Sequence, residues 1–313
     1  NGCRIRCLAR TSERAELCKE TGFEAVVGDI TGRESLKGAL DGVDMVVNLA
    51  GIIEDKGEMT FEKVHVEGTR NLVDEAKKAG VKHFFYQSAL GASLKSSSRY
   101  QKTKAEAEEI VKSSGLPYTI FRPSLVIGEK DGFTEKLKEL VGLGPVVIIP
   151  GDGNAKFQPI YVDDWVKCFM RIFSENPPPP PFAKGGNSIK SPFEKGGYRG
   201  IYEFGGPEHL TYNELVAQLM DAMGIKKSIV HMPMALAKAG VPFVWLSQKI
   251  GGLFGKKVPS VTNEQLSLLG VDNVCALDSV ENNFGFKPIT YKEALQRMKI
   301  STDPSFPKRG IIQ

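Results

Sequence analysis

Short apolar runs alternate with amphipathic stretches through the first half of the chain. The runs are rich in β-branched and aromatic residues and end at a polar residue or a glycine, which predicts strands buried on both faces. The predicted strands are Cys3–Leu8, Phe23–Val27, Met45–Leu49, His83–Gln87 and Tyr118–Arg122. The predicted helices are Ser12–Thr21, Glu34–Leu40, Phe61–Ala79 and Arg99–Ser114. This order predicts an α/β fold in which helices cover a parallel sheet.

The pattern changes after about Gly206. Thr211 with Glu214, and Thr290 with Glu293, have the spacing of a capping box, so each pair predicts the start of a helix. Five successive prolines and a repeated Pro-Phe-x-Lys-Gly-Gly unit favour an exposed loop, with a proline-rich ligand for a partner domain as the alternative. We therefore expect one domain at residues 1–175, a disordered Pro- and Gly-rich insertion at 176–200, and a smaller C-terminal α/β domain at 201–313.

The 313-residue chain has 41 lysines and arginines against 37 aspartates and glutamates, a formal net charge of +4. This charge is too small and too interspersed to indicate a nucleic-acid partner. The five cysteines form no CxxC pair and have no histidine at metal-ligand spacing, so we expect free thiols in a reducing compartment and no metal site. No apolar run approaches the roughly 18 residues of a membrane span.

Several motifs stand where the predicted strands end or on the helices that follow them. In chain order they are Gly28-Asp29-Ile30, Asn48-Leu49-Ala50-Gly51, His65-Val66-Glu67-Gly68-Thr69, Tyr86-Gln87-Ser88-Ala89, Tyr100-x-x-x-Lys104, Arg122-Pro123-Ser124 and Gln158-Pro159-Ile160-Tyr161. In this order they resemble the atypical or extended short-chain dehydrogenase/reductase superfamily, which includes NAD-dependent epimerases and dehydratases. The runs 88–92 and 103–108 are most similar to proteins resembling the nucleotide-binding accessory subunit of respiratory complex I. The resemblance implies a Rossmann-like, doubly wound parallel sheet that binds NAD(P) within residues 1–175, and a substrate or lid domain at 201–313.

The resemblance also implies a set of site residues. Tyr100, Lys104 and Ser88 are implied to be catalytic, and Tyr100 and Lys104 are four residues apart on one predicted helix, so they face the same way. We expect the ammonium to lower the pKa of the tyrosine, as acid/base catalysis near neutral pH requires. His65, where the family usually has asparagine, is interpreted as a buried, hydrogen-bonded histidine. The residues implied to bind the cofactor are Arg10, Asp29, Ile30, Leu49, Ala50, Gly51, Tyr100, Lys104, Arg122 and Pro123.

Arg10 bears on the choice of cofactor. It follows the first predicted strand, where NAD-selective relatives carry an acidic residue for the ribose hydroxyls. A cation there suits a 2′-phosphate, so NADP(H) is favoured over NAD(H). The alternative is an ordinary helix entry in which Thr11 or Ser12 is only an N-cap.

The family's first strand and its GxxGxxG turn, which bind pyrophosphate, have no counterpart in this sequence. That strand is central in the strand order 3-2-1-4-5-6. We therefore expect a sheet that lacks its first strand, and a chain that is a fragment of a longer protein with an impaired cofactor site.

Two functions are consistent with these motifs. The first is an NADP(H)-dependent oxidoreductase, or an epimerase or dehydratase, that acts on an unknown small molecule through Tyr100 and Lys104. The second is a non-catalytic nucleotide-binding subunit, accessory to or assembling a respiratory NADH dehydrogenase. The apolar run 241–246 and the lysines that follow it leave a peripheral membrane or respiratory-complex contact open, with a lid helix as the alternative. We expect a cytoplasmic location.

Overall fold

The structure is a computed structural model that describes residues 3–173, 200–240 and 261–300. The predicted insertion after residue 175 and the apolar run at 241–246 lie outside these ranges. The described chain folds into two compact units, which are treated separately below. The first consists of Asn1–Pro123 with Arg171–Glu203, and the second of Ser124–Met170 with Phe204–Gln313. Each unit thus draws on two stretches of the chain, a different division from the single predicted boundary near residue 175, which stays a prediction.

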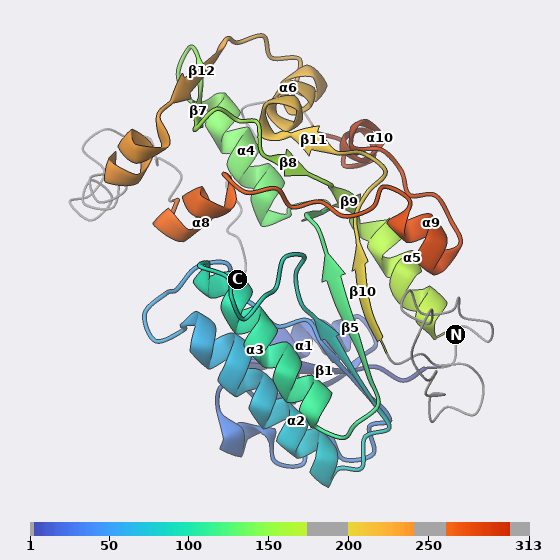
Figure 1. Cartoon of the computed structure of the whole chain (residues 1–313). Coiled ribbons are helices and arrows are strands. Elements are labelled where there is room, and N and C mark those ends of the chain that lie inside the picture. The colour runs from blue at the N-terminus through green and yellow to red at the C-terminus, as the bar shows by residue number, and fades with distance from the viewer. Residues whose placement is uncertain (1–2, 174–199, 241–260, 301–313) are drawn as a thin grey trace. The chain divides into compact units, whose positions relative to one another are not determined.

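The first unit is built on parallel strands (Figure 1). Its strands are β1 (Arg6–Ala9), β2 (Glu24–Val27), β3 (Met45–Asn48), β4 (His83–Gln87), β5 (Tyr118–Pro123) and β10 (Gly200–Phe204). β3, β4 and β5 are parallel neighbours, and the four-stranded sheet has the order β10-β5-β4-β3. β1 and β2 form a separate parallel pair. Among the described residues β1 pairs only with β2 and β3 only with β4, as expected for a Rossmann-like sheet without its central strand.

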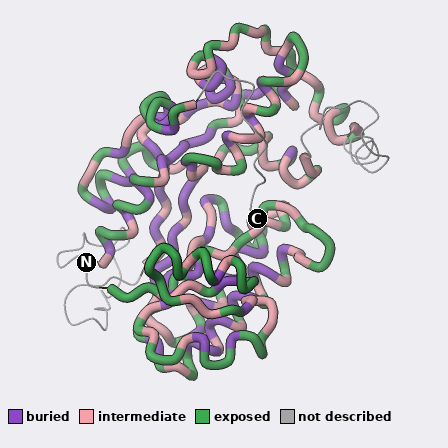
Figure 2. The backbone as a smooth tube through the Cα atoms, turned by 180° about the vertical axis from the view of Figure 1, so that it is seen from behind, coloured by how far each residue is buried: buried purple, intermediate pink, exposed green. Residues whose placement is uncertain are grey.

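Helices cover this sheet and bury its core. They are α1 (Ser12–Glu20), η1 (Arg33–Leu36), η2 (Glu62–Glu67), α2 (Gly68–Lys78) and α3 (Arg99–Ser113). α2 and α3 lie side by side and bury apolar side chains against β3, β4 and β5 (Figure 1). Buried positions concentrate in the strands and on the inward faces of the helices (Figure 2). Apolar burial of this kind is the main stabilising term of the unit.

Two predicted helices differ from the structure. The helix predicted at Glu34–Leu40 is wrong, because only the four-residue 3₁₀ turn η1 forms and Gly38 then takes a positive φ of 71°. The helix predicted at Phe61–Ala79 begins as the π-helix η2 before it continues as α2. It ends as expected at Gly80, whose φ of 69° is the left-handed conformation that stops helices.

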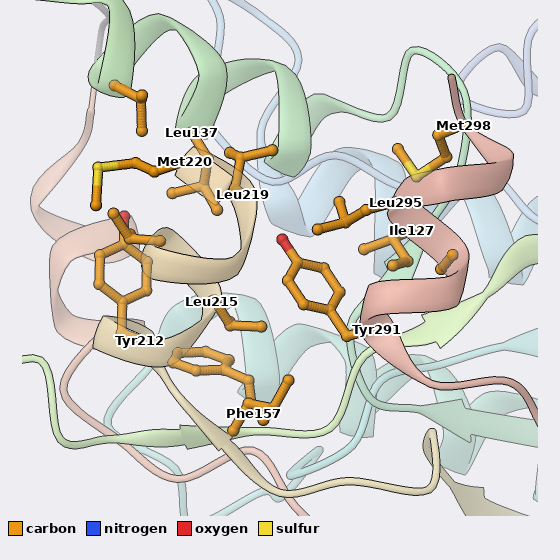
Figure 3. Close-up of a cluster of buried hydrophobic side chains, with 14 of the residues drawn as sticks. Ile127, Leu137, Phe157, Tyr212, Leu215, Leu219, Met220, Tyr291, Leu295 and Met298 are labelled. Atoms are coloured by element: carbon orange, nitrogen blue, oxygen red, sulfur yellow. The ribbon is translucent and has the colours of Figure 1, made fainter. Parts of the chain in front are cut away.

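The second unit has its own core of buried side chains, including Phe157, Tyr212, Leu215 and Tyr291 (Figure 3). Its strands are β6 (Val126–Ile127), β7 (Val147–Pro150), β8 (Lys156–Phe157), β9 (Ile160–Tyr161), β11 (Leu210–Thr211) and β12 (Ile229–Met232). Its helices are α4 (Gly132–Gly142), α5 (Val162–Ile172), α6 (Tyr212–Ala222), α8 (Asn263–Leu268), α9 (Ser279–Phe284) and α10 (Tyr291–Arg297). Both predicted capping boxes are confirmed, at the starts of α6 and α10.

All five cysteines lie in the described ranges, and no disulfide joins any two of them. None of the helices in the described ranges has both the length and the apolar character needed to cross a membrane.

Candidate functional site

Lys104 is a nearly buried cation of the first unit, with only 4% of its surface exposed. Its Nζ donates a hydrogen bond of 2.9 Å to the carbonyl oxygen of Gln87, the last residue of β4, and lies 5.1 Å from the centre of the Tyr86 ring. Burial lowers the pKa of Lys104 to about 8, while the charge of Glu108 opposes this shift. The helix α3 thus holds a cation at the carboxyl end of the central strands, the edge where open α/β sheets bind ligands.

Tyr100 lies one helical turn before Lys104 and is partly buried. Its ring packs edge-on against His65, with centroids 5.6 Å apart, and against Phe61 at 6.0 Å. Burial raises the pKa of Tyr100 to about 12. The predicted lowering of this pKa is therefore wrong for the protein by itself, because burial is the cause that acts on the Tyr100 hydroxyl.

Gly51 follows β3 and faces Lys104. A β-carbon placed on Gly51 would lie 3.1 Å from Lys104 Nζ, which is a tight contact, and 3.5 Å from His65 Nε2, which is an ordinary one, so a larger residue would crowd Lys104. The preceding turn is fixed by Asn48, whose side-chain oxygen accepts the Ala50 N–H at 3.1 Å. Leu49 leaves 52% of its surface exposed, and Gly51 is exposed as well. The predicted Leu49-Ala50-Gly51 wall is therefore open to a ligand and adjoins the predicted Lys104.

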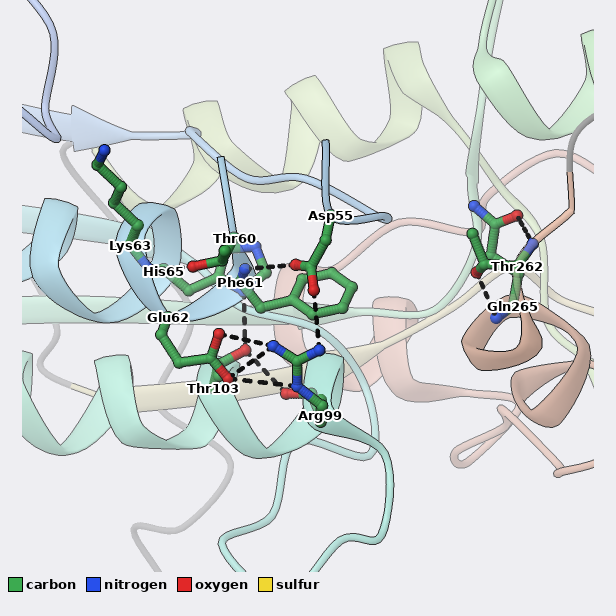
Figure 4. A network of polar contacts seen from close by, with 10 residues as sticks. All are labelled: Asp55, Thr60, Phe61, Glu62, Lys63, His65, Arg99, Thr103, Thr262 and Gln265. Carbon is green, nitrogen blue, oxygen red and sulfur yellow. Dashed lines mark hydrogen bonds and ion pairs between the residues drawn. The ribbon is translucent and has the colours of Figure 1, made fainter. Parts of the chain in front are cut away.

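The loop after Gly51 is tied to the start of α3. Arg99 forms ion pairs of 2.8 Å with Asp55 and with Glu62, and Asp55 also accepts the Phe61 N–H at 2.8 Å (Figure 4). The Arg99 guanidinium also lies 5.5 Å from the Phe61 ring centre. Exposed ion pairs of this kind contribute little singly, but here three contacts converge on one loop. They keep residues 52–62 beside the helix that carries Tyr100.

Ser88 follows β4 directly. Only 3% of its surface is exposed, and its hydroxyl has no hydrogen-bond partner among the described residues. An unpaired buried hydroxyl is destabilising by about 1–3 kcal/mol, so it is uncommon unless a ligand or water completes it. Its position next to Gln87, whose carbonyl oxygen accepts from Lys104, places Ser88 and Lys104 at the same strand end.

Asp29 and Ile30 form a second, well-braced turn after β2. Asp29 accepts the backbone N–H and the hydroxyl of Thr31, at 2.8 and 2.9 Å. The Ile30 carbonyl accepts a hydrogen bond of 2.9 Å from Asn71, and the Ile30 side chain lies where any side chain on Gly68 would have to go. The turn is therefore anchored on α2, which fixes the positions of Asp29 and Ile30, both predicted to bind the cofactor.

Arg10 follows β1 at the same edge. The Gly28 N–H donates to the Ala9 carbonyl at 2.9 Å, so the parallel pair brings Arg10 and the turn at Asp29 to neighbouring strand ends. Arg10 is exposed and forms no ion pair with the described residues. Thr11 is the N-cap of α1, with its side chain accepting the Arg14 N–H, so the capping role considered for Thr11 is confirmed and does not involve Arg10.

Arg122 and Pro123 are engaged within the protein. The Arg122 guanidinium donates to both oxygens of Glu108, at 2.7 and 2.6 Å, and to Glu203 at 2.7 Å, which raises its pKa despite partial burial. The Pro123 carbonyl accepts the Leu90 N–H at 2.9 Å. The structure thus gives Arg122 carboxylate partners and does not join it to the group around Lys104; a cofactor contact for either residue stays a prediction.

His65 is buried and hydrogen-bonded, as predicted. Its contacts with Ile52 and Thr103 were not predicted from the sequence, nor was the Gln87 carbonyl as the acceptor of Lys104. The one sequence signal for His65 is that it departs from the family's asparagine. Nothing in the sequence distinguishes Thr103 from an ordinary residue of a helix.

The first unit is an α/β fold, and most of these predicted site residues lie at or just after the ends of its parallel strands. Comparisons with known proteins agree. Residues 1–141 match the NAD(P)H-binding family. The chain is 27% identical over 249 residues to the mitochondrial NADH dehydrogenase (ubiquinone) 1 alpha subcomplex subunit 9 of Arabidopsis thaliana, covering 79% of this chain and 57% of that protein. It is 23% identical over 297 residues to 3beta-hydroxysteroid-dehydrogenase/decarboxylase isoform 2 of the same plant, covering 87% of this chain and 50% of that protein.

A shorter match, 31% identical over 121 residues, is to the photosystem II assembly factor Ycf39 of Cyanophora paradoxa, covering 39% of this chain and 37% of that protein. The chain thus spans little more than half the length of the first two curated relatives. Among solved structures, the fold is similar to an NADPH-dependent quinone oxidoreductase from Escherichia coli complexed with NADPH, at a TM-score of 0.66 and 18% identity over 94% of this chain and 90% of the other. It is also similar to a dTDP-glucose 4,6-dehydratase from Streptomyces venezuelae with NAD bound, at a TM-score of 0.61 and 20% identity over 95% and 86%.

Residues 1–141 thus match the NAD(P)H-binding family, and the curated relatives and the fold agree with the resemblance of the sequence to atypical and extended short-chain dehydrogenases/reductases.

Proposed function

We propose that the protein is an NADP(H)-dependent oxidoreductase, or a related epimerase or dehydratase, whose chemistry is carried by Tyr100 with Lys104 and Ser88. The observation that carries this proposal is the almost fully buried Lys104 ammonium, one helical turn from Tyr100 and beside the open Gly51 wall. A buried cation is destabilising unless it is paired and hydrogen-bonded, and perturbed ionisable groups cluster at functional sites.

Four features of the residues present fit a nicotinamide dinucleotide. The described residues offer Lys104 Nζ one hydrogen-bond acceptor, which leaves donors for ribose hydroxyls. The Ser88 hydroxyl lacks a partner, and Gly51 leaves room where a side chain would crowd Lys104. Arg10, at the end of β1, would face a 2′-phosphate, which supports NADP(H) over NAD(H). The sequence contains no GxxGxxG turn for the pyrophosphate, so these residues account for the two ends of the cofactor only.

Such a cofactor, when bound, donates or accepts a hydride. With a pKa of about 12, Tyr100 is neutral at pH 7 and can donate its proton to a substrate carbonyl oxygen. The Ser88 hydroxyl can donate a hydrogen bond to the same oxygen. The positive charge of Lys104 stabilises the phenolate that Tyr100 becomes after donation. A tyrosine that starts neutral favours the reductive direction, in which an acid is needed first.

The test is a Tyr100→Phe variant of the protein at its natural full length, assayed with NADPH and a panel of quinones, ketones and nucleotide sugars. We expect the NADPH dissociation constant to change less than about threefold and turnover to fall by about 10²- to 10⁴-fold, the usual contribution of general acid catalysis. Tyr118→Phe, a partly buried tyrosine at the start of β5, is the matched control and should leave turnover unchanged. Full turnover in the Tyr100 variant would contradict the proposal.

A nucleotide-binding accessory or assembly subunit is the second candidate. Two of the relatives carry such names, a subunit of NADH dehydrogenase and a photosystem II assembly factor. The raised pKa of Tyr100 also suits a ring that only packs against Phe61 and His65. This second function would be favoured if the protein binds NADPH but turns over no substrate in the panel, and if Tyr100→Phe leaves NADPH binding unchanged.

A further inference from the structure

His65 lies at the centre of the site although no chemical step needs it. Its side chain is fully buried, and its Nε2 accepts the backbone N–H of Ile52 at 3.1 Å. A ring nitrogen that accepts a hydrogen bond carries no proton, so in the neutral ring the proton is on Nδ1. Nδ1 lies 3.0 Å from the Thr103 hydroxyl and therefore donates to it. The ring thus bridges the turn after β3 and the helix α3 in one defined tautomer.

Thr103 extends the bridge into the helix. Its hydroxyl lies 2.9 Å from the Arg99 carbonyl and 3.1 Å from the Tyr100 carbonyl, and it donates its own proton in this direction. One chain of hydrogen bonds therefore runs from the Ile52 N–H through His65 and Thr103 to the helical turn that bears Tyr100. Lys104 follows Thr103 directly and is the nearest group to Gly51.

The surroundings of His65 keep its ring neutral. Burial, and next the positive charge of Lys104, lower the pKa of His65 to about 3. Phe61 lies tilted by 30° against the ring and Tyr100 packs edge-on, each with a centroid distance of 5.6 Å. A second ring proton would abolish the acceptor on Nε2 and set two cations beside each other.

We propose that His65 is a positioning residue, whose neutral Nδ1–H form holds the Gly51-Ile52 turn and the helix α3 at the separation that places the Lys104 ammonium beside the glycine wall. This inference rests on the proposed function, because the gap so defined would receive the nicotinamide half of the cofactor. The side-chain amide of an asparagine at this position would extend only as far as Nδ1 of the histidine. It could therefore form a hydrogen bond with Thr103 but not with Ile52. The histidine spans both.

The side-chain lengths allow the two hydrogen bonds to be tested separately. His65→Asn retains a donor near Nδ1, His65→Gln retains an acceptor near Nε2, and His65→Phe removes both while keeping a ring. Thr103→Val removes the hydroxyl at nearly constant volume. His83 is the matched control, since it is also fully buried and lies 3.0 Å from a threonine hydroxyl, that of Thr119, but at the opposite end of β4.

The experiment uses the protein at its natural full length with NADPH as the probe. We expect two-dimensional ¹H–¹⁵N spectra at pH 7 to show the His65 ring in the Nδ1–H form. We expect NADPH binding, followed by fluorescence, to weaken about tenfold to a hundredfold in His65→Phe, and about three- to tenfold in the asparagine, glutamine and Thr103→Val variants, because each lost buried hydrogen bond loosens the site. His83→Phe should lower the thermal unfolding midpoint and leave NADPH affinity within about twofold.

An Nε2–H tautomer overturns the inference without need of any variant. So does a His65→Phe protein that binds NADPH as the unaltered protein does, or a His83→Phe protein that loses affinity equally, since the effect is then one of general stability. If the unaltered protein binds no NADPH, the proposed function fails, and the tautomer alone decides whether the bridge exists.

Discussion

Replacing Lys104 by methionine is expected to stabilise the protein while removing its ligand affinity. The pKa of Lys104 falls from 10.5 to about 8 in the folded protein. At 1.36 kcal/mol per unit, this corresponds to about 3 kcal/mol by which burial disfavours the charged side chain at pH 7. Methionine has a similar length and no charge, but it forfeits the hydrogen bond to Gln87 and the contact with the Tyr86 ring, worth about 1–2 kcal/mol together. The expected net gain in the free energy of unfolding at pH 7 is therefore about 1–2 kcal/mol.

The same shift fixes how this gain depends on pH. Below pH 8 Lys104 is protonated in both states, so the full penalty is present. Between pH 8 and 10.5 the folded protein releases the proton and the unfolded chain keeps it, so the unaltered protein becomes more stable as pH rises. The advantage of Lys104→Met should therefore shrink by about 2 kcal/mol between pH 7 and about pH 9.5.

Urea unfolding at the two pH values measures both quantities. Lys102→Met is the matched control, because Lys102 is exposed on the same helix and should change stability by less than about 0.5 kcal/mol at either pH. This prediction is contradicted if Lys104→Met is less stable than the unaltered protein at pH 7, or if its gain in the free energy of unfolding is the same at both pH values. Either result would show that burial does not destabilise the charged form of Lys104.

Three further substitutions test other parts of the account. Arg10→Asp should weaken NADPH binding by about tenfold to a hundredfold and leave NADH binding within about threefold, and fluorescence titration measures both affinities. Equal losses of affinity for NADPH and NADH would show that Arg10 does not bind the 2′-phosphate. Gly68→Ala should lower the thermal unfolding midpoint, because the added β-carbon would lie 2.7 Å from Ile30 Cδ1. The overpacking costs about 1–3 kcal/mol, which exceeds the gain in helix propensity. A raised midpoint would show that the Ile30 turn moves to make room. Glu108→Gln should cost about 2–4 kcal/mol in chemical denaturation, since it leaves the Arg122 charge without its buried partner, and an unchanged midpoint would contradict that.

The sequence predicted the strands well because each is an apolar run bounded by polar residues. The five predicted strands of the first unit all form, with ends that match or differ by at most three residues. The capping boxes at Thr211 and Thr290 were predicted correctly, since they depend on residues three positions apart. Patterns that are local in the chain are therefore the ones that can be read from it.

Contacts between distant residues were not readable in this way. The pairing of Arg122 with Glu108 spans 14 residues, and that of His65 with Thr103 spans 38. Neither leaves a periodic signal, and an arginine after a strand resembles a phosphate ligand as readily as an ion-pair partner. The π-helical entry to α2 likewise has no mark in a sequence whose apolar spacing suits an ordinary helix. The order of the motifs predicted which strand ends carry the site residues. The packing showed which of these predicted residues lie close together.

The most direct test of the central claim is a calorimetric titration of the protein at its natural full length with NADPH, alongside Lys104→Met and Lys102→Met. The account predicts saturable binding of one NADPH per chain, a loss of affinity of at least about tenfold in Lys104→Met, and no change in Lys102→Met. Absence of saturable binding in the unaltered protein, or equal affinity in Lys104→Met, would contradict the claim that this strand edge is a dinucleotide site organised around Lys104.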